Sequence, residues 1–214
     1  MIQFEQVSKR YSGGFEALSS INFSLESGEM AFLTGHSGAG KSTFIKLIAL
    51  LEKPSCGKVV VNGQALHTLK KQDIAKYRSK IGMTFPLLLS DRTIYDNVAL
   101  PLQIQGHDRQ TIAKRVHAAL DLVGLLHKEK MMSSYLSEGD QQRVGIARAV
   151  VHQPTLLLAD EPTSNLDPSL SSSIMNVFDH LNQVGVSVLV ATHDVSLIAA
   201  MKHRIVLLRR GKIC

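Results

Sequence analysis

The chain has 214 residues, of which 44% are hydrophobic and 20% are charged, values that are ordinary for a globular protein with one substantial core. It contains no run of about 18 apolar residues without charges and begins with no signal-peptide pattern, so we expect no membrane-spanning segment and a location in the cytosol. The net charge of +6 comes from scattered basic residues with few aromatic residues beside them, which argues against nucleic-acid binding.

The first third of the chain predicts strands around a glycine-rich loop. Weak alternation of apolar residues over residues 2–7 and 21–25 predicts two half-buried strands. Residues 30–34 form a short apolar run, which is typical of a buried strand, and the apolar spacing over residues 43–51 indicates a buried helix. The pair Asn62-Gly63 follows a β-branched run, and it predicts a tight hairpin because both residues tolerate positive φ.

The middle of the chain predicts helices. Apolar residues recur at spacings of three and four over residues 107–124, where Gly124 can close the helix. A second helix is expected over residues 137–151 with Ser137 as its N-cap. Because this region has little strand pattern, we interpret residues of about 86–153 as a helical subdomain within a single domain spanning residues 1–214.

The last third alternates apolar runs with a helix. Continuous apolar runs at 156–160, 186–192 and 204–208 predict buried strands, and a helix is expected from about 168 to 184. Short apolar strands alternating with helices are typical of a parallel sheet that is covered on both faces. The predicted fold is therefore α/β, with a mostly parallel core sheet, an antiparallel β subdomain at the front and the helical subdomain.

The most specific motif is the phosphate-binding loop pattern G-x-x-x-x-G-K-[ST] at residues 35–42. Glycines let successive backbone N–H groups point at phosphate oxygens, and a helix that starts after the loop adds its positive end. Lys41 would reach the β- and γ-phosphates, while the Ser42 hydroxyl would hold Mg²⁺. The loop lies between the expected strand and the expected helix, which is the context that the motif requires.

Two carboxylates end the apolar run at 156–160. Asp160 would lie at the carboxyl edge of the sheet, where phosphate-loop folds hold Mg²⁺, and Glu161 could orient or deprotonate the water that attacks the γ-phosphate. The alternative is two exposed carboxylates at a strand end, which the phosphate loop upstream disfavours.

The segment L-S-E-G-D-Q-Q-R at residues 136–143 places Ser137 and Gly139 at a helix start, which is a second anion-binding turn. Taken alone, Ser137 is best read as a plain N-cap. Two such turns in one chain suggest that a second copy supplies half of a composite site.

The order of these motifs, followed by L-L-L-A-D-E-P-T, N-L-D and A-T-H-D, resembles the ATP-binding subunits of ABC transporters over essentially the whole chain. Residues 31–43, 91–102 and 141–151 are most similar to the cell-division members, and His36 favours that group over the ATPases of lipoprotein-release systems. The alternatives are such an exporter subunit or an ATP-gated clamp with weak hydrolysis. A ribosome- or DNA-associated ABC protein usually has two cassettes or long insertions, which this chain lacks.

The resemblance implies a phosphate-loop NTPase that hydrolyses ATP with Mg²⁺, is a homodimer when ATP is bound, and binds no nucleic acid. It also implies an FtsX-like integral membrane partner and a peripheral location on the cytoplasmic face of the bacterial inner membrane. Glu161 would be the general base, and His193 would contact the γ-phosphate and the attacking water. Asp160 and Ser42 would hold Mg²⁺, and Asn165-Leu166-Asp167 would cross between protomers. The implied nucleotide-binding residues, with Tyr11 stacking on adenine, are Tyr11, Gly35, His36, Ser37, Gly38, Ala39, Gly40, Lys41, Ser42, Thr43, Ser137, Gly139 and Asp167.

Two positions depart from the family pattern. Pro86 stands where family members carry a glutamine that contacts Mg²⁺ and water, and the three leucines that follow it could bury or form a surface for the partner. Glu138 replaces the first glycine after Ser137. Two unit charges about 4 Å apart at an effective dielectric constant of about 20 repel by roughly 4 kcal/mol, so we expect weakened dimer closure and hydrolysis.

Overall fold

In the computed structural model, residues 1–84, 87–164 and 166–214 are described, and they form two sheets with helices packed between and beside them. The larger sheet has the strand order β10-β9-β3-β8-β7-β6, and its strands are parallel except for the short β10. This confirms the mostly parallel core sheet. Its strands are β3 (Met30–Thr34), β6 (Ile81–Thr84), β7 (Leu156–Asp160), β8 (Ser187–Ala191), β9 (Arg204–Arg209) and β10 (Lys212–Ile213).

The core sheet separates two hydrophobic cores. Because side chains alternate along a strand, Leu33 packs on the face of the first core while its neighbour Phe32 packs in the second. The same division separates Leu158 from Leu157 on β7. Both faces are thus buried, which explains why these strands are continuous apolar runs and not an alternating pattern.

The smaller sheet is antiparallel, with the order β2-β1-β4-β5. Phe4, Phe23 and Phe44 form an aromatic cluster, in which the rings of Phe4 and Phe44 stack at 4.4 Å and join this sheet to helix α1. The predicted hairpin at Asn62-Gly63 is present, with both residues at positive φ. The elements are β1 (Ile2–Arg10), β2 (Glu16–Leu25), α1 (Lys41–Ile48), β4 (Cys56–Val61) and β5 (Gln64–Ala65).

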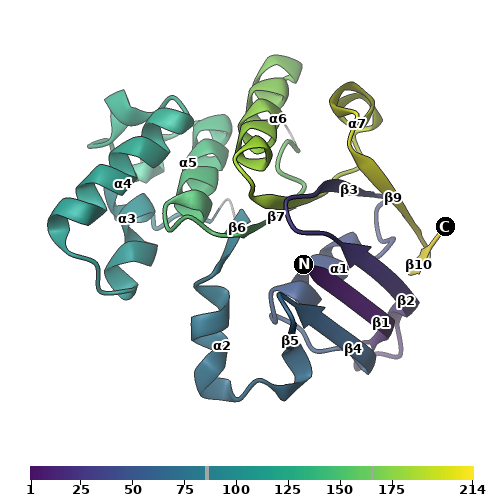
Figure 1. Ribbon diagram of the computed structural model, residues 1–214. Coiled ribbons are helices and arrows are strands. Elements are labelled where there is room, and N and C mark those ends of the chain that lie inside the picture. Colours follow the sequence, from purple (N-terminus) through teal and green to yellow (C-terminus); the bar gives the residue numbers. More distant parts are fainter. Residues whose placement is uncertain (85–86, 165) are drawn as a thin grey trace.

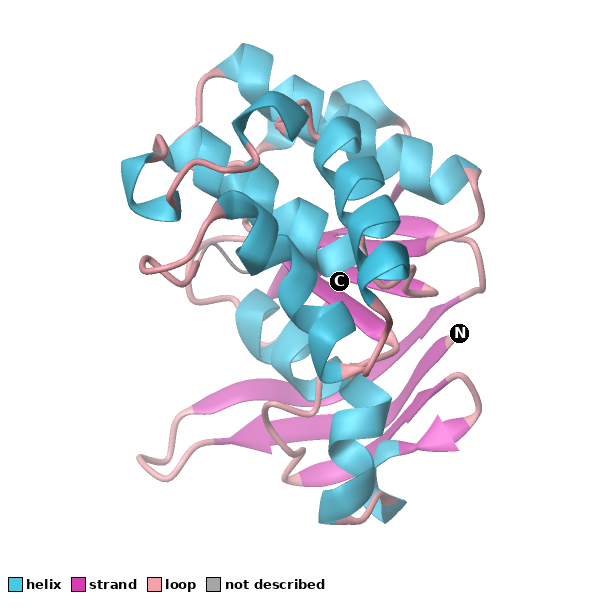
Figure 2. Cartoon of the chain, turned by 90° about the vertical axis from the view of Figure 1, so that its left-hand side faces the viewer, coloured by secondary structure: helices cyan, strands magenta, loops and turns pink. Residues whose placement is uncertain are grey.

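Helices α3, α4 and α5 gather at one end of the molecule, away from the antiparallel sheet (Figures 1 and 2). Their apolar residues pack against the sheet in the second core. Because this core includes residues of both the helices and the sheet, the helical subdomain at about 86–153 stays a prediction. None of the helices in the described ranges is long and apolar enough to cross a bilayer. The remaining helices are α2 (Lys71–Arg78), α3 (Ile94–Ile104), α4 (Arg109–Leu122), α5 (Glu138–Val150), α6 (Pro168–Gln183) and α7 (Val195–Met201).

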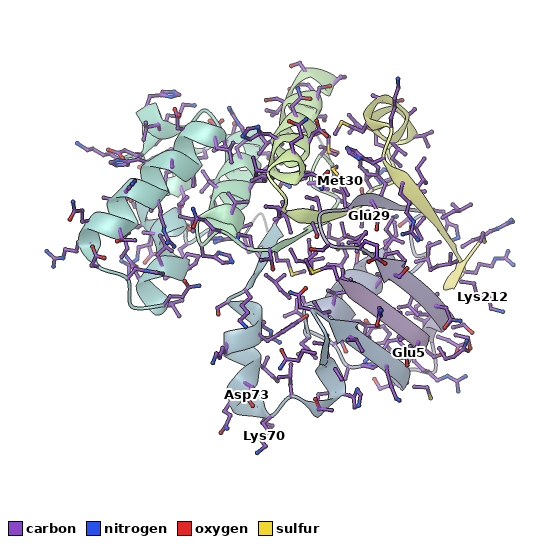
Figure 3. The ribbon with its side chains drawn as sticks, viewed as in Figure 1. Glu5, Glu29, Met30, Lys70, Asp73 and Lys212 are labelled. Atoms are coloured by element: carbon purple, nitrogen blue, oxygen red, sulfur yellow. The ribbon has the colours of Figure 1, made fainter. Side chains whose placement is uncertain are left out.

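Most expected helices agree with the structure to within two or three residues. The helix after the phosphate loop ends at Ile48 and not at Leu51, because Leu50 adopts positive φ and turns the chain. The two densest basic groups of the sequence are also far apart. Lys70, beside the start of α2, and Lys212, next to the Arg209-Arg210 turn, lie on separate edges of the molecule (Figure 3).

Candidate nucleotide-binding site

A cavity of about 400 Å³ opens at the carboxyl edge of the core sheet. Its walls come from distant parts of the sequence, because the phosphate loop follows β3, His193 follows the adjacent strand β8, and Glu161 follows β7 on the far side of β8. The carboxyl edge of a parallel sheet is where α/β folds bind ligands. The cavity is lined by Phe15, Ala17, Ser37, Gly38, Ala39, Gly40, Lys41, Ser42, Thr43, Glu161 and His193.

The phosphate loop is fixed between β3 and α1. Gly40 is the N-cap of α1 with φ of 110°, and Gly38 has φ of 77°, conformations that favour glycine. Gly35 packs against the neighbouring strand β9, since a Cβ at this position would lie 2.1 Å from the carbonyl oxygen of Leu208. The N-terminus of α1 therefore faces the cavity with a backbone suited to bind phosphate oxygens.

Lys41 is buried at the base of the loop. Its ammonium donates a hydrogen bond of 2.7 Å to the carbonyl oxygen of Gly35 and lies 3.3 Å from Oε1 of Glu161. A cation at this place can neutralise phosphate charge without moving far.

Glu161 occupies an unusual backbone conformation. Its φ is 49°, and its N–H donates a hydrogen bond of 2.8 Å to the carbonyl oxygen of Ala191 on β8. The carboxylate lies between His193 and Lys41. Its Oε2 is 2.9 Å from Nδ1 of His193, and its Oε1 is 3.3 Å from the ammonium of Lys41. Left-handed conformations of non-glycine residues concentrate at functional sites, where surrounding contacts hold them in place. Sequence patterns gave no indication of this conformation.

Asp160 has the properties of a cation ligand. Its Oδ1 is buried without a hydrogen-bond partner. Burial raises the pKa of its carboxyl above the ordinary value, and the hydrogen bond with Ser42 offsets this only in part. A buried, unsatisfied carboxylate oxygen beside a serine hydroxyl fits the hard oxygen ligands that Mg²⁺ requires.

The other predicted phosphate contacts lie outside this cavity. Ser137 is the N-cap of α5, where its hydroxyl accepts a hydrogen bond of 3.2 Å from the N–H of Asp140. Asp167 is the N-cap of α6 and accepts hydrogen bonds from the backbone of Ser169 and Leu170. Of the described residues, Ser137, Gly139 and Asp167 therefore do not meet the phosphate loop within one chain.

The two acidic residues at the start of α5 differ in environment. Glu138 is exposed at the first helical position, whereas Asp140 is buried and pairs with Lys128 at 2.7 Å and with Arg143. Burial alone would raise the pKa of the Asp140 carboxyl, but the hydrogen bonds and charges of Lys128 and Arg143 outweigh it and lower the pKa. The charge of Asp140 is thus neutralised internally.

Two aromatic residues flank the turn between β1 and β2. The Tyr11 hydroxyl lies 3.2 Å from Oγ1 of Thr43, and Lys9 covers the Tyr11 ring with its ammonium 4.9 Å from the centroid. Phe15 is the aromatic side chain that lines the cavity, and sequence reasoning missed it. An aromatic residue in a glycine-containing turn before β2 was the available signal.

The three leucines that follow strand β6 differ in their exposure to solvent. Leu87 is 80% exposed and Leu89 is exposed to a lesser extent, whereas Leu88 packs on the second core. Pro86, the position of the missing glutamine, and Asn165, in the predicted crossing loop, lie outside the described residues.

Comparisons with known proteins agree with this geometry. A family model described as ABC transporter matches residues 18–164. The cell division ATP-binding protein FtsE of Escherichia coli strain K12 is 54% identical, with 100% of this chain and 97% of that protein covered. FtsE of Bacillus subtilis strain 168 is 42% identical, with 100% and 94% covered. Among solved structures, the ATP-binding cassette MJ0796, in a dimeric post-hydrolysis state with ADP and Pi, aligns with a TM-score of 0.93 and 33% identity, covering 100% of this chain and 96% of that chain.

Proposed function

Because the chain belongs to the ABC transporter family, and within it to the FtsE cell division ATP-binding proteins, it is an ATPase, and we propose that it powers an FtsX-like integral membrane protein from the cytoplasmic face of the bacterial inner membrane. Its similarity to FtsE along the full chain favours this function over that of a lipoprotein-release exporter. The observation that carries the proposal is the placement of the Glu161 carboxylate at the phosphate-loop cavity, between Lys41 and His193.

ATP binds with its phosphates on the loop of residues 35–43. The backbone N–H groups at the start of α1 and the ammonium of Lys41 bind the β- and γ-phosphate oxygens. When phosphate arrives, it competes with the carbonyl oxygen of Gly35 for the ammonium, and Lys41 moves its hydrogen bonds from the protein to the substrate.

Hydrolysis is an in-line attack of water on the γ-phosphorus. Glu161 accepts the proton of the water, and His193, which already contacts that carboxylate, orients it and contacts the γ-phosphate. The bond between the γ-phosphorus and the bridging oxygen breaks, and ADP leaves with the electron pair. Lys41 balances the negative charge that spreads over the phosphate oxygens.

Asp160 and Ser42 are the residues that would hold Mg²⁺. The unsatisfied Oδ1 of Asp160 and the hydroxyl of Ser42 supply oxygen ligands beside the loop. When bound, the ion supplies Lewis-acid neutralisation of the phosphate oxygens.

A second copy of the chain completes the site. Ser137 and Gly139 lie outside the cavity of their own chain, so a head-to-tail homodimer would place them on the γ-phosphate held by the partner's loop, with Asp167 near the crossing between protomers. The proposed dimer therefore forms when ATP is bound. The exposed Leu87 is the part of the leucine run that is available to the membrane partner.

The test is steady-state ATPase of the chain co-purified with its membrane partner, in comparison with Glu161→Gln. We expect the variant to lose at least about 100-fold in kcat while it still binds ATP, because the amide cannot accept the proton. Glu5→Gln, on the exposed side of β1, is the matched control for the same carboxylate-to-amide exchange away from the site. Phosphate release by Glu161→Gln at the rate of the unmodified protein would overturn the proposal.

A further inference from the structure

We propose that Lys128 is a positioning residue for the Ser137 turn: it holds the Asp140 carboxylate away from the Ser137 hydroxyl, so that the hydroxyl can donate to the γ-phosphate bound by a partner protomer. This inference rests on the composite ATP site proposed above and deepens it. Lys128 lies in the short 3₁₀ turn Leu126–Lys128, between α4 and α5, and acts on the site through Asp140.

The start of α5 has the residues of a capping box, in which the N-cap residue and the third helical residue bond each other. Ser137 is the N-cap, and the N–H of Asp140, the third helical residue, donates a hydrogen bond of 3.2 Å to the Ser137 hydroxyl. The side chain of the third residue usually turns back toward the N-cap residue. A carboxylate that did so here would occupy donors of the turn and place a negative charge beside the N–H groups that would bind phosphate.

Helix α3 shows the turned-back arrangement in the same chain. Thr93 is its N-cap, and the N–H of Asp96 donates a hydrogen bond of 3.0 Å to the Thr93 hydroxyl, as in α5. The Asp96 carboxylate also turns back, so that its Oδ2 accepts a hydrogen bond of 2.7 Å from the same hydroxyl. The single proton of the Thr93 hydroxyl is thus used within the cap, and a hydroxyl in this state has no proton left to donate to a ligand.

In α5 the carboxylate turns the other way. Oδ2 of Asp140 accepts a hydrogen bond of 2.7 Å from the Lys128 ammonium, and Oδ1 accepts one from the guanidinium of Arg143. Arg143 also donates to the carbonyl oxygen of Val123 at the end of α4, and Asp140 is buried whereas Ser137 is exposed. Asp140 therefore leaves the Ser137 proton to a phosphate oxygen, and its own negative charge is paired.

The two cations that hold Asp140 are not equivalent. Arg143 lies one turn further along α5 and moves with that helix, whereas the loop that carries Lys128 is bonded to α3. The N–H of Tyr95 donates a hydrogen bond of 2.9 Å to the carbonyl oxygen of Glu129, and Leu125 is buried in the second core. Lys128 is thus a fixed point outside α5, and its loss would free the Oδ2 atom to accept the proton of the cap hydroxyl.

ATP-dependent dimerisation in a Glu161→Gln background, which retains ATP, measures this effect. By sedimentation velocity, Lys128→Gln should weaken dimerisation about tenfold, because the γ-phosphate loses a hydrogen-bond donor and one oxygen of a carboxylate beside it loses its cation. The Kd for ADP, which has no γ-phosphate, should stay unchanged by calorimetry, since the phosphate loop is intact. Lys130→Gln, at an exposed position of the same loop, is the matched control for net charge, and Lys128→Arg should retain dimerisation.

A second substitution separates positioning from a general loss of stability. Asp140→Asn, added to Lys128→Gln, should recover most of the dimerisation, because an amide carries no charge and is a weaker acceptor for the Ser137 proton. It should not recover stability to urea, since the bond to Arg143 loses its charge as well. Full dimerisation of Lys128→Gln, or a further loss in the double variant, would overturn the role of Lys128.

The Glu161→Gln chain itself reports on the proposed function. If it binds neither ADP nor ATP, or stays monomeric with ATP, the proposed ATP site fails and the role of Lys128 fails with it. If it dimerises with ATP and Lys128→Gln dimerises equally well, the composite site stands and only the role of Lys128 is refuted.

Discussion

The burial of the Asp160 carboxylate lowers the stability of the folded chain at neutral pH. Its pKa is raised because burial disfavours the charged form, so its contribution to stability is present below the unfolded pKa and is lost as the pH rises through the folded pKa. At neutral pH the ionised carboxylate therefore destabilises the nucleotide-free protein. A ligand that binds its free Oδ1 would remove that cost.

We predict that Asp160→Asn stabilises the nucleotide-free chain and abolishes Mg²⁺-dependent ATP hydrolysis. The gain in the free energy of unfolding should be a fraction of a kcal/mol to about 1 kcal/mol, since partial exposure of the site screens the charge. Urea unfolding of the nucleotide-free chain measures the first effect, and steady-state ATPase in the presence of Mg²⁺ measures the second. Asp91→Asn, an exposed carboxylate with a weak pair, controls for the change in net charge. A variant less stable than the unmodified chain would contradict the prediction.

The pKa of Asp140 is shifted in the opposite direction to that of Asp160. Lys128 and Arg143 hold the pKa of its carboxyl below the ordinary value of 3.8, against the effect of burial. A lowered pKa contributes stability that is present above the unfolded pKa and is lost as the pH falls through the folded pKa.

Asp140→Asn should accordingly lower the free energy of unfolding by about 2 kcal/mol near neutral pH, because two charge-assisted hydrogen bonds lose their acceptor charge. The difference from the unmodified chain should shrink as the pH falls below about 4. Chemical denaturation from pH 7 to pH 3 follows it, with Lys128→Gln in a double-mutant cycle. A difference that stays constant over this range would show that the pair does not cause the effect.

At the scale of elements, the phosphate loop packs against strand β9, which is not part of the sequence motif. Gly35 lies against the backbone of β9, so the loop is seated on the neighbouring strand as well as joined to β3 and α1. Gly38, in the same loop, also has positive φ, but a Cβ there would meet nothing within 4 Å. A comparison of Gly35 with Gly38 therefore separates the effect of close packing from the effect of backbone conformation.

Gly35→Ala should therefore destabilise the chain by about 2–4 kcal/mol and weaken nucleotide binding, because the added methyl would collide with a carbonyl oxygen that cannot move alone. Gly38→Ala should cost only about 1 kcal/mol, the strain of its backbone conformation. Thermal unfolding and tripolyphosphate binding of the two variants check this. Equal losses for both would mean that contact with β9 is unimportant.

The elements that could be predicted from the sequence are those with a strong local pattern. The buried strands β3 and β7 and the capped helix α5 carry their signals within five to thirteen consecutive residues. Helix α2 has no such signal, because only Ile74 and Tyr77 of its residues face the core and the others are polar apart from Ala75.

The candidate site divides in the same way. The phosphate loop has the fixed spacing that phosphate binding requires, and Asp160 and Glu161 end a continuous apolar run, so local patterns identify them. The positive φ of Glu161 arises instead beside a contact between distant segments, the hydrogen bond from its N–H to Ala191 at the end of β8. No local pattern encodes such contacts, and only the assembled fold reveals them.

At the scale of the whole molecule, the two parts of the proposed composite site do not meet within one chain. The cavity contains the phosphate loop and Glu161, whereas the turn with Ser137 and Gly139 begins α5 elsewhere. Within that turn the charge of Asp140 is neutralised by its partners, so Glu138 is the acidic group that a dimer would bring toward the γ-phosphate of the other protomer. In the proposed dimer, we therefore expect the exposed Glu138 side chain to limit ATP-dependent closure.

Replacement of Glu138 tests whether its charge limits ATP-dependent closure of the dimer. In a Glu161→Gln background, which retains ATP, Glu138→Gly should strengthen ATP-dependent dimerisation by about tenfold or more, because removal of a repulsion of even 1.4 kcal/mol has that effect. Glu138→Gln, which keeps the size but not the charge, should give most of the gain. Sedimentation velocity at two salt concentrations measures it, and the gain should fall at high salt as screening grows. Dimerisation that Glu138→Gly leaves unchanged at low salt would place the limit on closure elsewhere.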